Sequence, residues 1–261
     1  MTALQMVGGG KMGQALLGGL IDGGWAEPAD LAVVEVDATQ RDAVAAALPG
    51  VNVQAAPLAG VDAVLAVKPH LVVDVCRSLD RPTRVLSVAA GITLASIEQE
   101  LPAETPVVRS MPNTPALVGA GASAVAGGAS ASDADVEWAV SILGAVGEVV
   151  VVAEPLLDVV TGLSGSGPAY VFLVAEAMID AGVSAGLPRD LATTLAQQTL
   201  FGAAKLLVDG DTSAAELRAG VTTPAGTTAA GLRVLEERAV RAAFIDAVAA
   251  ASDRSRELGG A

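Results

Sequence analysis

A glycine pattern near the start of the sequence places the strongest constraint on the fold. The apolar run Leu4–Val7 leads directly into Gly8-Gly9-Gly10-Lys11-Met12-Gly13, and a helical pattern follows it. The glycines at positions 8, 10 and 13 satisfy the spacing G-x-G-x-x-G between a strand and a helix, which is the fingerprint of a dinucleotide-binding turn. The sequence therefore predicts a Rossmann-type βα unit at this place.

Each position of this turn has a chemical reason. Gly8 permits a tight turn, Gly10 lets the backbone approach a pyrophosphate, and Gly13 allows the helix to pack closely on the strand. The helix N-terminus, with Lys11 and Met12 in its first turn, offers backbone amides and partial positive charge. Lys11 is not a Walker lysine, because the residues around it do not fit that motif. A tight turn without a ligand is the alternative.

Acidic residues follow the second expected strand. Glu35 lies near the end of the apolar run at residues 31–36, 22 positions after Gly13, and Asp37 comes next. A carboxylate at this place hydrogen-bonds the adenosine ribose and repels the 2′-phosphate of NADPH. Arg41 is the nearby cation, and we expect it to lie too far along the next helix to clamp a phosphate. These residues favour NADH over NADPH, unless Glu35 simply faces solvent.

Short β-branched runs alternate with helical patterns in the first part of the chain. This alternation is typical of βαβ units and predicts a mostly parallel sheet. The expected strands are residues 4–7, 31–36, 63–67, 84–88, 107–110, 122–126 and 148–152. The expected helices between them are residues 12–22, 40–48, 71–79 and 133–143.

The β-branched runs largely stop near residue 153, where helical patterns take over at residues 168–185, 189–208, 213–219, 225–237 and 239–257. The expected fold class is α/β, with a dinucleotide-binding Rossmann-type domain at 1–153 and an all-helical dimerisation and substrate domain at 154–261. Pro168 and Pro188 are expected in first helical turns, and Ser213 as a helix cap. An Ala-rich helical domain of this size buries too little apolar surface alone, so we expect it to pair with a second copy.

Composition and charge argue against several classes of function. Fifteen basic and 29 acidic residues give a net charge of −14, and aromatic residues make up 2%, so nucleic acid is not an expected partner. His70 and Cys76 are the only residues of their types, too few for the common zinc sites, so no metal is expected. A Ser-His-Asp hydrolase would have to use His70, which we expect to be an ordinary loop residue.

Targeting signals are not apparent in the sequence. The N-terminal residues carry no basic segment, and the longest charge-free stretch, residues 110–132, is broken by Pro, Asn and Gly. We therefore expect neither a signal peptide nor a membrane span. A soluble, cytoplasmic protein is the expectation, and the single cysteine fits a reducing compartment.

Polar residues end two further strands. Val67-Lys68-Pro69 follows an apolar run, at the strand end where open α/β sheets bind ligands. Lys68 either lines the cofactor crevice or is the solvated end of its strand. The segment Arg109-Ser110-Met111-Pro112-Asn113-Thr114-Pro115 ends another strand in a rigid loop that carries amide and hydroxyl groups.

The helical half contains two helix starts rich in Gly, Ser and Thr, at residues 163–170 and 221–228. In the second, Thr223 is expected as the N-cap and Pro224 as the first helical residue. A carboxylate could then be held by free backbone amides, namely those of Ala225, Gly226 and Thr227. Two ordinary capped helices are the alternative.

Together these segments resemble the pyrroline-5-carboxylate reductase family. The strings cover essentially the whole chain in the family's order: Gly8-x-Gly10-Lys11-Met12-Gly13, Ala66-Val67-Lys68-Pro69, Ser87-Val88-Ala89-Ala90-Gly91-Ile92, Arg109 to Pro115, Ser164-Gly165-Ser166-Gly167-Pro168-Ala169-Tyr170 and Val221-Thr222-Thr223-Pro224-Ala225-Gly226-Thr227-Thr228. The resemblance implies NAD(P)H-dependent reduction of 1-pyrroline-5-carboxylate to L-proline, the last step of proline biosynthesis. It also implies homodimers through the helical domain, which in several members associate into decamers.

The resemblance further implies roles for individual residues. Thr228 is the catalytic hydrogen-bond partner of the ring nitrogen, and the substrate-binding residues are Thr223, Ala225, Gly226, Thr227 and Thr228. The cofactor-binding residues are Gly8, Gly10, Lys11, Met12, Gly13, Glu35, Val67, Lys68, Pro69, Ala89, Gly91, Pro112 and Asn113. Two features depart from the family: Ala225 replaces the usual glycine, and Glu35 and Asp37 stand where many members accommodate the 2′-phosphate of NADPH.

Two other functions stay open at this point. The first is a reductase of the 6-phosphogluconate-dehydrogenase-like class, which usually places a lysine in the long helix after the Rossmann domain. Residues 168–186 contain no lysine, which argues against it. The second is a dinucleotide-sensing protein without turnover, against which Thr228 and both glycine-rich turns argue.

Overall fold

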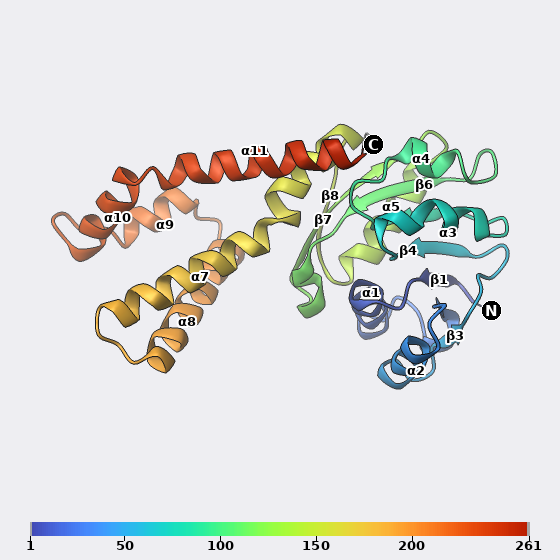
Figure 1. Cartoon of the computed structure of the whole chain (residues 1–261), viewed down its shortest axis with the longest axis horizontal. Helices are drawn as coiled ribbons and strands as arrows, with labels where there is room; N and C mark the ends of the chain where they lie inside the picture. Colours follow the sequence, from blue (N-terminus) through green and yellow to red (C-terminus); the bar gives the residue numbers. More distant parts are fainter. Residues whose placement is uncertain (1, 260–261) are drawn as a thin grey trace. The chain divides into compact units, whose positions relative to one another are not determined.

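The computed structural model describes residues 2–259 and contains two compact units (Figure 1). The first unit holds the residues up to Ser166 together with those from Val248 onward, and the second unit holds Gly167–Ala247. These units differ from the predicted division at residue 153. The reason is that the chain beyond the last strand still packs on the sheet through Leu157, and that the C-terminal helix returns to the first unit.

The first unit is built on an eight-stranded sheet with the order β3-β2-β1-β4-β5-β6-β7-β8. The strands are β1 (Leu4–Val7), β2 (Leu31–Val34), β3 (Asn52–Gln54), β4 (Asp62–Leu65), β5 (Val85–Ser87), β6 (Val107–Met111), β7 (Gly121–Gly127) and β8 (Gly147–Val151). Neighbouring strands pair in parallel, apart from the antiparallel pair β6 and β7. The predicted mostly parallel sheet is therefore confirmed. Strand β3 was not among the expected strands, because Val53 is its only β-branched residue.

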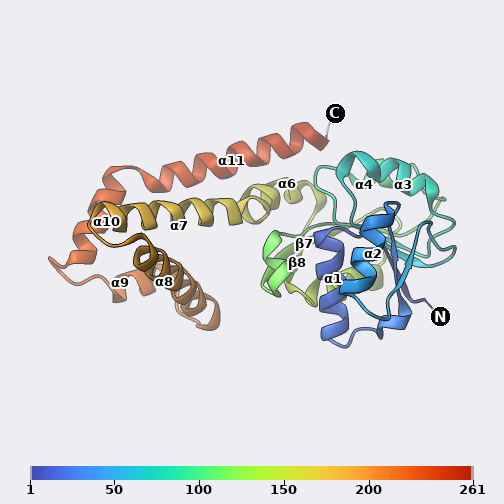
Figure 2. The ribbon, with the colours of Figure 1, turned by 60° about the horizontal axis from the view of Figure 1, so that its bottom comes forward.

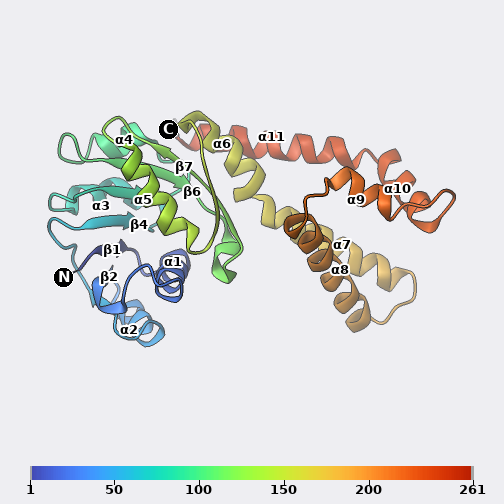
Figure 3. The same ribbon diagram turned by 180° about the vertical axis from the view of Figure 1, so that it is seen from behind.

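Helices cover both faces of this sheet (Figure 3). One face packs against α1 (Lys11–Asp22), α2 (Ala38–Ala47) and α5 (Asp133–Gly144). The other packs against α3 (Val72–Ser78), α4 (Leu94–Glu98) and α6 (Leu157–Val160). Every residue of β1 and β2 is buried, as expected for strands covered on two sides. Short helical turns complete the unit: the 3₁₀ segments Pro28–Asp30, Pro69–Leu71, Thr114–Val118 and Glu154–Leu156, and the π-helical turn Thr161–Gly165.

The second unit is helical, as predicted (Figure 2). Its helices are α7 (Gly167–Ser184), α8 (Arg189–Asp209), α9 (Ala214–Gly220), α10 (Thr227–Glu237) and the first part of α11 (Val240–Gly259). Ser213 caps α9 in a capping box with Glu216, as predicted. Pro168 lies in the first turn of α7, whereas Pro188 precedes α8 as its N-cap residue, so the prediction that Pro188 lies inside the first turn is wrong.

One helical stretch of the described residues, Glu154–Ser184, is long and apolar enough to cross a membrane by length and composition alone. Only 11% of its most apolar window is buried in this structure. Its exposed side chains include Phe172 and Leu173, which are 63% and 65% exposed. The apolar side chains of α7 are thus largely exposed in a single copy of the chain.

Candidate active site

The first glycine-rich turn has the geometry that dinucleotide binding requires. Gly8 has a φ of +112°, and a Cβ added there would lie 2.5 Å from the carbonyl oxygen of Ala66. A Cβ on Gly13 would lie 2.3 Å from the carbonyl oxygen of Gly8. By contrast, a Cβ on Gly10 would meet no atom within 4 Å. Gly8 and Gly13 are thus required by the backbone, while Gly10 leaves open space at the N-terminus of α1.

This turn forms part of a cleft of about 590 Å³. The cleft lies at the carboxyl ends of β1, β2 and β4, where the strand order reverses between β1 and β4. Such a switch point is where open α/β sheets bind their ligands. Of the predicted coenzyme residues, those that line the cleft are Gly8, Gly10, Glu35, Val67 and Lys68. Its size, its glycine wall and the amides at the start of α1 fit a dinucleotide.

Glu35 ties the glycine turn to the end of β2. Its Oε2 atom accepts the Gly9 N–H at 3.0 Å, and its Oε1 atom accepts the Asp37 N–H at 3.0 Å. Asp37 in turn caps α2, because its Oδ1 atom accepts the Gln40 N–H at 2.8 Å. Both carboxylates therefore hold the backbone beside the cleft, a structural role that the sequence analysis did not foresee.

Arg41 contacts the backbone directly after β2. Its Nη1 atom donates to the carbonyl oxygens of Glu35 and Val36, at 2.9 and 2.8 Å. Arg41 lies in the first turn of α2, which begins at Ala38, and its side chain folds back onto the end of β2. That it does not clamp a phosphate stays a prediction. A positive guanidinium thus stands beside the two carboxylates at the end of β2.

Residues that follow β4 form another part of the wall of the cleft. Lys68 lines the cleft, and Pro69 begins the 3₁₀ turn that follows it. The side chains of Lys68 and Pro69 are both exposed. His70, which the sequence analysis set aside as an ordinary loop residue, also lines the cleft. The position of His70 directly after Lys68-Pro69 was the available signal for this.

The other predicted coenzyme residues do not line this cleft. Ala89 is buried in the core, and Gly91, with a φ of +76°, packs against Leu258 of α11. Pro112 is buried, and Asn113 uses both ends of its amide inside the protein. Asn113 Nδ2 donates to the Ser164 carbonyl oxygen at 3.1 Å, and its Oδ1 accepts the Ala122 N–H at 2.9 Å. Lys11 and Met12 open α1, beside the cleft.

The second glycine-rich turn, before α10, differs from its prediction. Helix α10 begins at Thr227 with Gly226 as its N-cap, so the expected N-cap role of Thr223 is wrong. Thr223 instead accepts the Gly226 N–H on its carbonyl oxygen at 3.0 Å, which closes a turn with Pro224 at its second position. The Gly226 amide is therefore occupied rather than free. The amides without an intrahelical partner belong to the first turn of α10, which starts at Thr227 and Thr228.

Four threonines lie at or just before this helix start, and they differ in whether their hydroxyls are bonded within the chain. The Thr222 hydroxyl is bonded: its Oγ1 donates to the carbonyl oxygen of Arg218 at 2.6 Å. Within residues 2–259, no hydrogen bond is found for the hydroxyls of Thr223, Thr227 and Thr228. First-turn amides and free hydroxyls at one helix N-terminus suit a carboxylate and a polar ring atom.

Cys76, the only cysteine of the sequence, is buried. Burial raises the pKa of the Cys76 thiol to about 11, with a smaller contribution from Glu100, so the thiol is protonated at neutral pH. Across residues 2–259, no group of three His, Cys, Asp or Glu side chains could hold a metal ion.

Comparison with known proteins decides the family. A family model for pyrroline-5-carboxylate reductase dimerisation matches residues 154–258, and one described as NADP oxidoreductase coenzyme F420-dependent matches residues 3–91. The pyrroline-5-carboxylate reductase of Corynebacterium melassecola is 44% identical, with 99% of each chain covered. This chain belongs to the pyrroline-5-carboxylate reductase family. The enzyme of that name from Synechocystis is 43% identical, with 98% of each chain covered.

Solved structures of this family agree with the fold. A pyrroline-5-carboxylate reductase from Coxiella burnetii has a TM-score of 0.91 at 36% identity, with 98% of each chain covered. The Plasmodium falciparum pyrroline carboxylate reductase, solved with NADP bound, has a TM-score of 0.84 at 28% identity, covering 99% of this chain and 98% of that one.

The open space at Gly10 leads to a prediction. Gly10→Ala should fold normally, because the added methyl meets no protein atom, yet weaken NADH binding by about tenfold or more, because the methyl occupies the pyrophosphate's approach. Fluorescence titration with NADH measures this. Gly18→Ala is the matched control, since its methyl also meets nothing and lies away from the turn. Equal NADH affinity in Gly10→Ala and the parent would contradict the assignment of the cleft.

Proposed function

We propose that this protein reduces 1-pyrroline-5-carboxylate to L-proline with a nicotinamide coenzyme, as the last step of proline biosynthesis in the cytoplasm. The observation that carries the proposal is the full-length relationship to pyrroline-5-carboxylate reductases. The chain also has both glycine-rich turns, one before α1 and one before α10. When bound, the coenzyme supplies the hydride that the imine carbon accepts. The protonated imine is already electrophilic, so the protein needs to orient the reactants more than to supply a strong acid.

The two glycine-rich turns bind different reactants: the turn before α1 binds the coenzyme, and the turn before α10 binds the substrate. The amides at the start of α1 hold the pyrophosphate, with Lys68 beside it in the cleft. Asn113 holds the loop after β6 through its bonds to the Ser164 carbonyl oxygen and the Ala122 N–H, and by this loop Pro112 and Asn113 shape the nicotinamide side indirectly. At α10, the amides from Thr227 onward hold the substrate carboxylate, and the Thr228 hydroxyl bonds the ring nitrogen.

The experiment is a turnover assay with pyrroline-5-carboxylate. Coenzyme oxidation should depend on the imine, and L-proline should form in equal amount. A protein that binds NADH but leaves the imine unreduced would support a sensing role instead. Oxidation of a hydroxy acid without imine reduction would support the 6-phosphogluconate-dehydrogenase-like alternative.

For the coenzyme, we propose a preference for NADH. A 2′-phosphate would stand near the Glu35 and Asp37 carboxylates, and their repulsion favours NADH by about tenfold in kcat/KM. Asp37→Asn should lower the ratio of kcat/KM with NADH to kcat/KM with NADPH, because the asparagine side chain still caps α2 but carries no charge. Steady-state kinetics with both coenzymes measure the ratio. A clear preference for NADPH that disappears in Arg41→Ala would contradict the proposal and assign the phosphate to Arg41.

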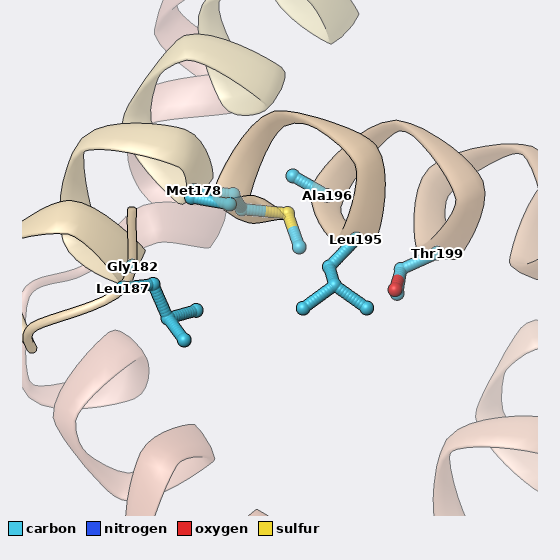
Figure 4. A pocket seen from close by; sticks show the side chains of 7 residues that line it. Met178, Gly182, Leu187, Leu195, Ala196 and Thr199 are labelled. Atoms are coloured by element: carbon cyan, nitrogen blue, oxygen red, sulfur yellow. The ribbon is translucent and has the colours of Figure 1, made fainter. Parts of the chain in front are cut away.

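For the assembly, we propose a homodimer through the second unit, with further association into decamers. Large apolar side chains of this unit are exposed, among them Phe201 at 62%, Leu206 at 66% and Ile245 at 69%. Helices α7 and α8 also border an open groove of about 160 Å³, shown in Figure 4, whose walls include Met178, Leu187 and Leu195. Monomeric proteins rarely leave so much apolar surface in water.

Light scattering at micromolar concentration should give a mass of at least twice 25.7 kDa. Phe201→Asp should lower that mass, because it places a charge on the apolar surface, whereas Glu148→Ser on β8 should leave it unchanged. A fully active monomer of 25.7 kDa would contradict this proposal.

A further inference from the structure

The turn before α10 contains an alanine in a backbone conformation that alanine disfavours. The Gly226 N–H donates to the Thr223 carbonyl oxygen at 3.0 Å, so Pro224 and Ala225 are the two central residues. Ala225 has a φ of +57°. Proline holds φ negative at the first central position, and a positive φ at the second then defines a type II turn. This position normally requires glycine or asparagine.

The same four residues, Thr223–Gly226, are also compatible with a type I turn. A type I turn also accepts proline at its first central position and needs no positive φ at the second. The two turns differ mainly in the orientation of the peptide between Pro224 and Ala225. Glycine at 225 would stabilise the type II turn, whereas alanine raises its free energy and brings the two forms closer together.

The turn leads directly into the proposed substrate site. The hydrogen bond from the Gly226 N–H to the Thr223 carbonyl oxygen joins the two ends of the turn, and a Cβ added at Gly226 would lie 2.3 Å from Thr223 Oγ1, so residue 226 has no room for a side chain. Thr227 and Thr228 follow at the start of α10. A change in the Pro224–Ala225 peptide therefore moves groups that adjoin the amides proposed to hold the carboxylate.

We propose that Ala225 is a positioning residue that makes this turn a two-state element, in which the type II form binds the substrate carboxylate. The proposal rests on the proposed function. Alanine lowers the population of the competent form in the free protein, and the apparent dissociation constant rises in proportion. L-proline carries the same carboxylate, so the product is also held less tightly.

A substitution series at residue 225 separates backbone conformation from side-chain size. Ala225→Gly should lower the KM for the imine and the inhibition constant of L-proline about two- to fivefold, with kcat changing less than KM. Ala225→Asn should also lower both constants, because asparagine tolerates the left-handed region although it is larger than alanine. Ala225→Val should raise both constants.

The chain offers a matched control. Ala239, between α10 and α11, has a φ of +55° and thus the same conformation away from the proposed site. Ala239→Gly should raise the Tm as Ala225→Gly does, but leave the KM for the imine unchanged.

Two results would overturn the proposal: a KM that is unchanged in Ala225→Gly although the Tm rises, or a KM that follows side-chain size, so that Ala225→Asn binds the imine more weakly than the parent. These results differ from a failure of the proposed function, in which the parent protein itself does not reduce the imine.

Discussion

Replacing Thr228 by valine should lower kcat/KM for 1-pyrroline-5-carboxylate by about 10- to 150-fold, since a hydrogen bond to a charged group contributes about 1.5–3 kcal/mol. Valine keeps the shape of the side chain but removes the hydroxyl, which has no hydrogen-bond partner among the described residues. The dissociation constant of NADH should stay nearly unchanged. Steady-state kinetics and NADH titration together measure both effects.

Thr222→Val is the matched control for this experiment. Its hydroxyl bonds the Arg218 carbonyl oxygen within the helical unit, so the substitution removes an internal hydrogen bond and no bond to substrate. We expect a small loss of stability and an unchanged kcat/KM. If Thr228→Val has the same kcat/KM for the imine as the parent protein, the Thr228 hydroxyl does not hold the ring nitrogen, and backbone amides or water must do so instead.

The fold could be predicted largely from the sequence because its signals are local. The apolar run at residues 4–7 and the glycine spacing that follows it identify β1 and the start of α1 directly. Strand β3 lacks such a signal, since Asn52 and Gln54 flank a single valine. Its place in the sheet comes from parallel pairing with β2, which a local pattern does not contain.

The candidate site was less predictable, because its details depend on contacts between distant residues. The bond from Gly9 to Glu35 spans 26 positions, and the spacing rule that places Glu35 near the glycine turn assigns its carboxylate to the ribose, not to a backbone N–H. Arg41 illustrates the same limit, since its guanidinium returns to the strand end that precedes its helix. Pro224 fits both the first turn of a helix and the second position of a β-turn, so the local sequence alone could not place the start of α10.

A buried charge network formed by Arg109, Glu154 and Asp158 was also not predicted from the sequence. Arg109 in the middle of β6 is 5% exposed, and its Nη1 lies 2.9 Å from Glu154 Oε1. The same Glu154 oxygen accepts the Leu94 N–H at 2.7 Å. Asp158 lies 4.0 Å from Arg109 Nη2 and accepts the Ser255 hydroxyl at 2.6 Å. Arg109 thus joins the sheet to α4, to the segment that enters α6, and to the end of α11, all within the first unit.

Arg109→Met should therefore lower the free energy of unfolding of the first unit by about 2–4 kcal/mol, because it leaves two carboxylates without their cation. The expected loss is below that of a fully buried pair, since the Glu154 side chain is 29% exposed. Urea unfolding followed by tryptophan fluorescence isolates this unit, which contains Trp25 and Trp138, the only two tryptophans of the chain. Arg254→Met is the control: it breaks an ion pair with Glu257 whose side chains are 65% and 64% exposed, and should cost less than about 1 kcal/mol. Equal losses in the two variants would mean that the network around Arg109 contributes no more than a solvated surface pair.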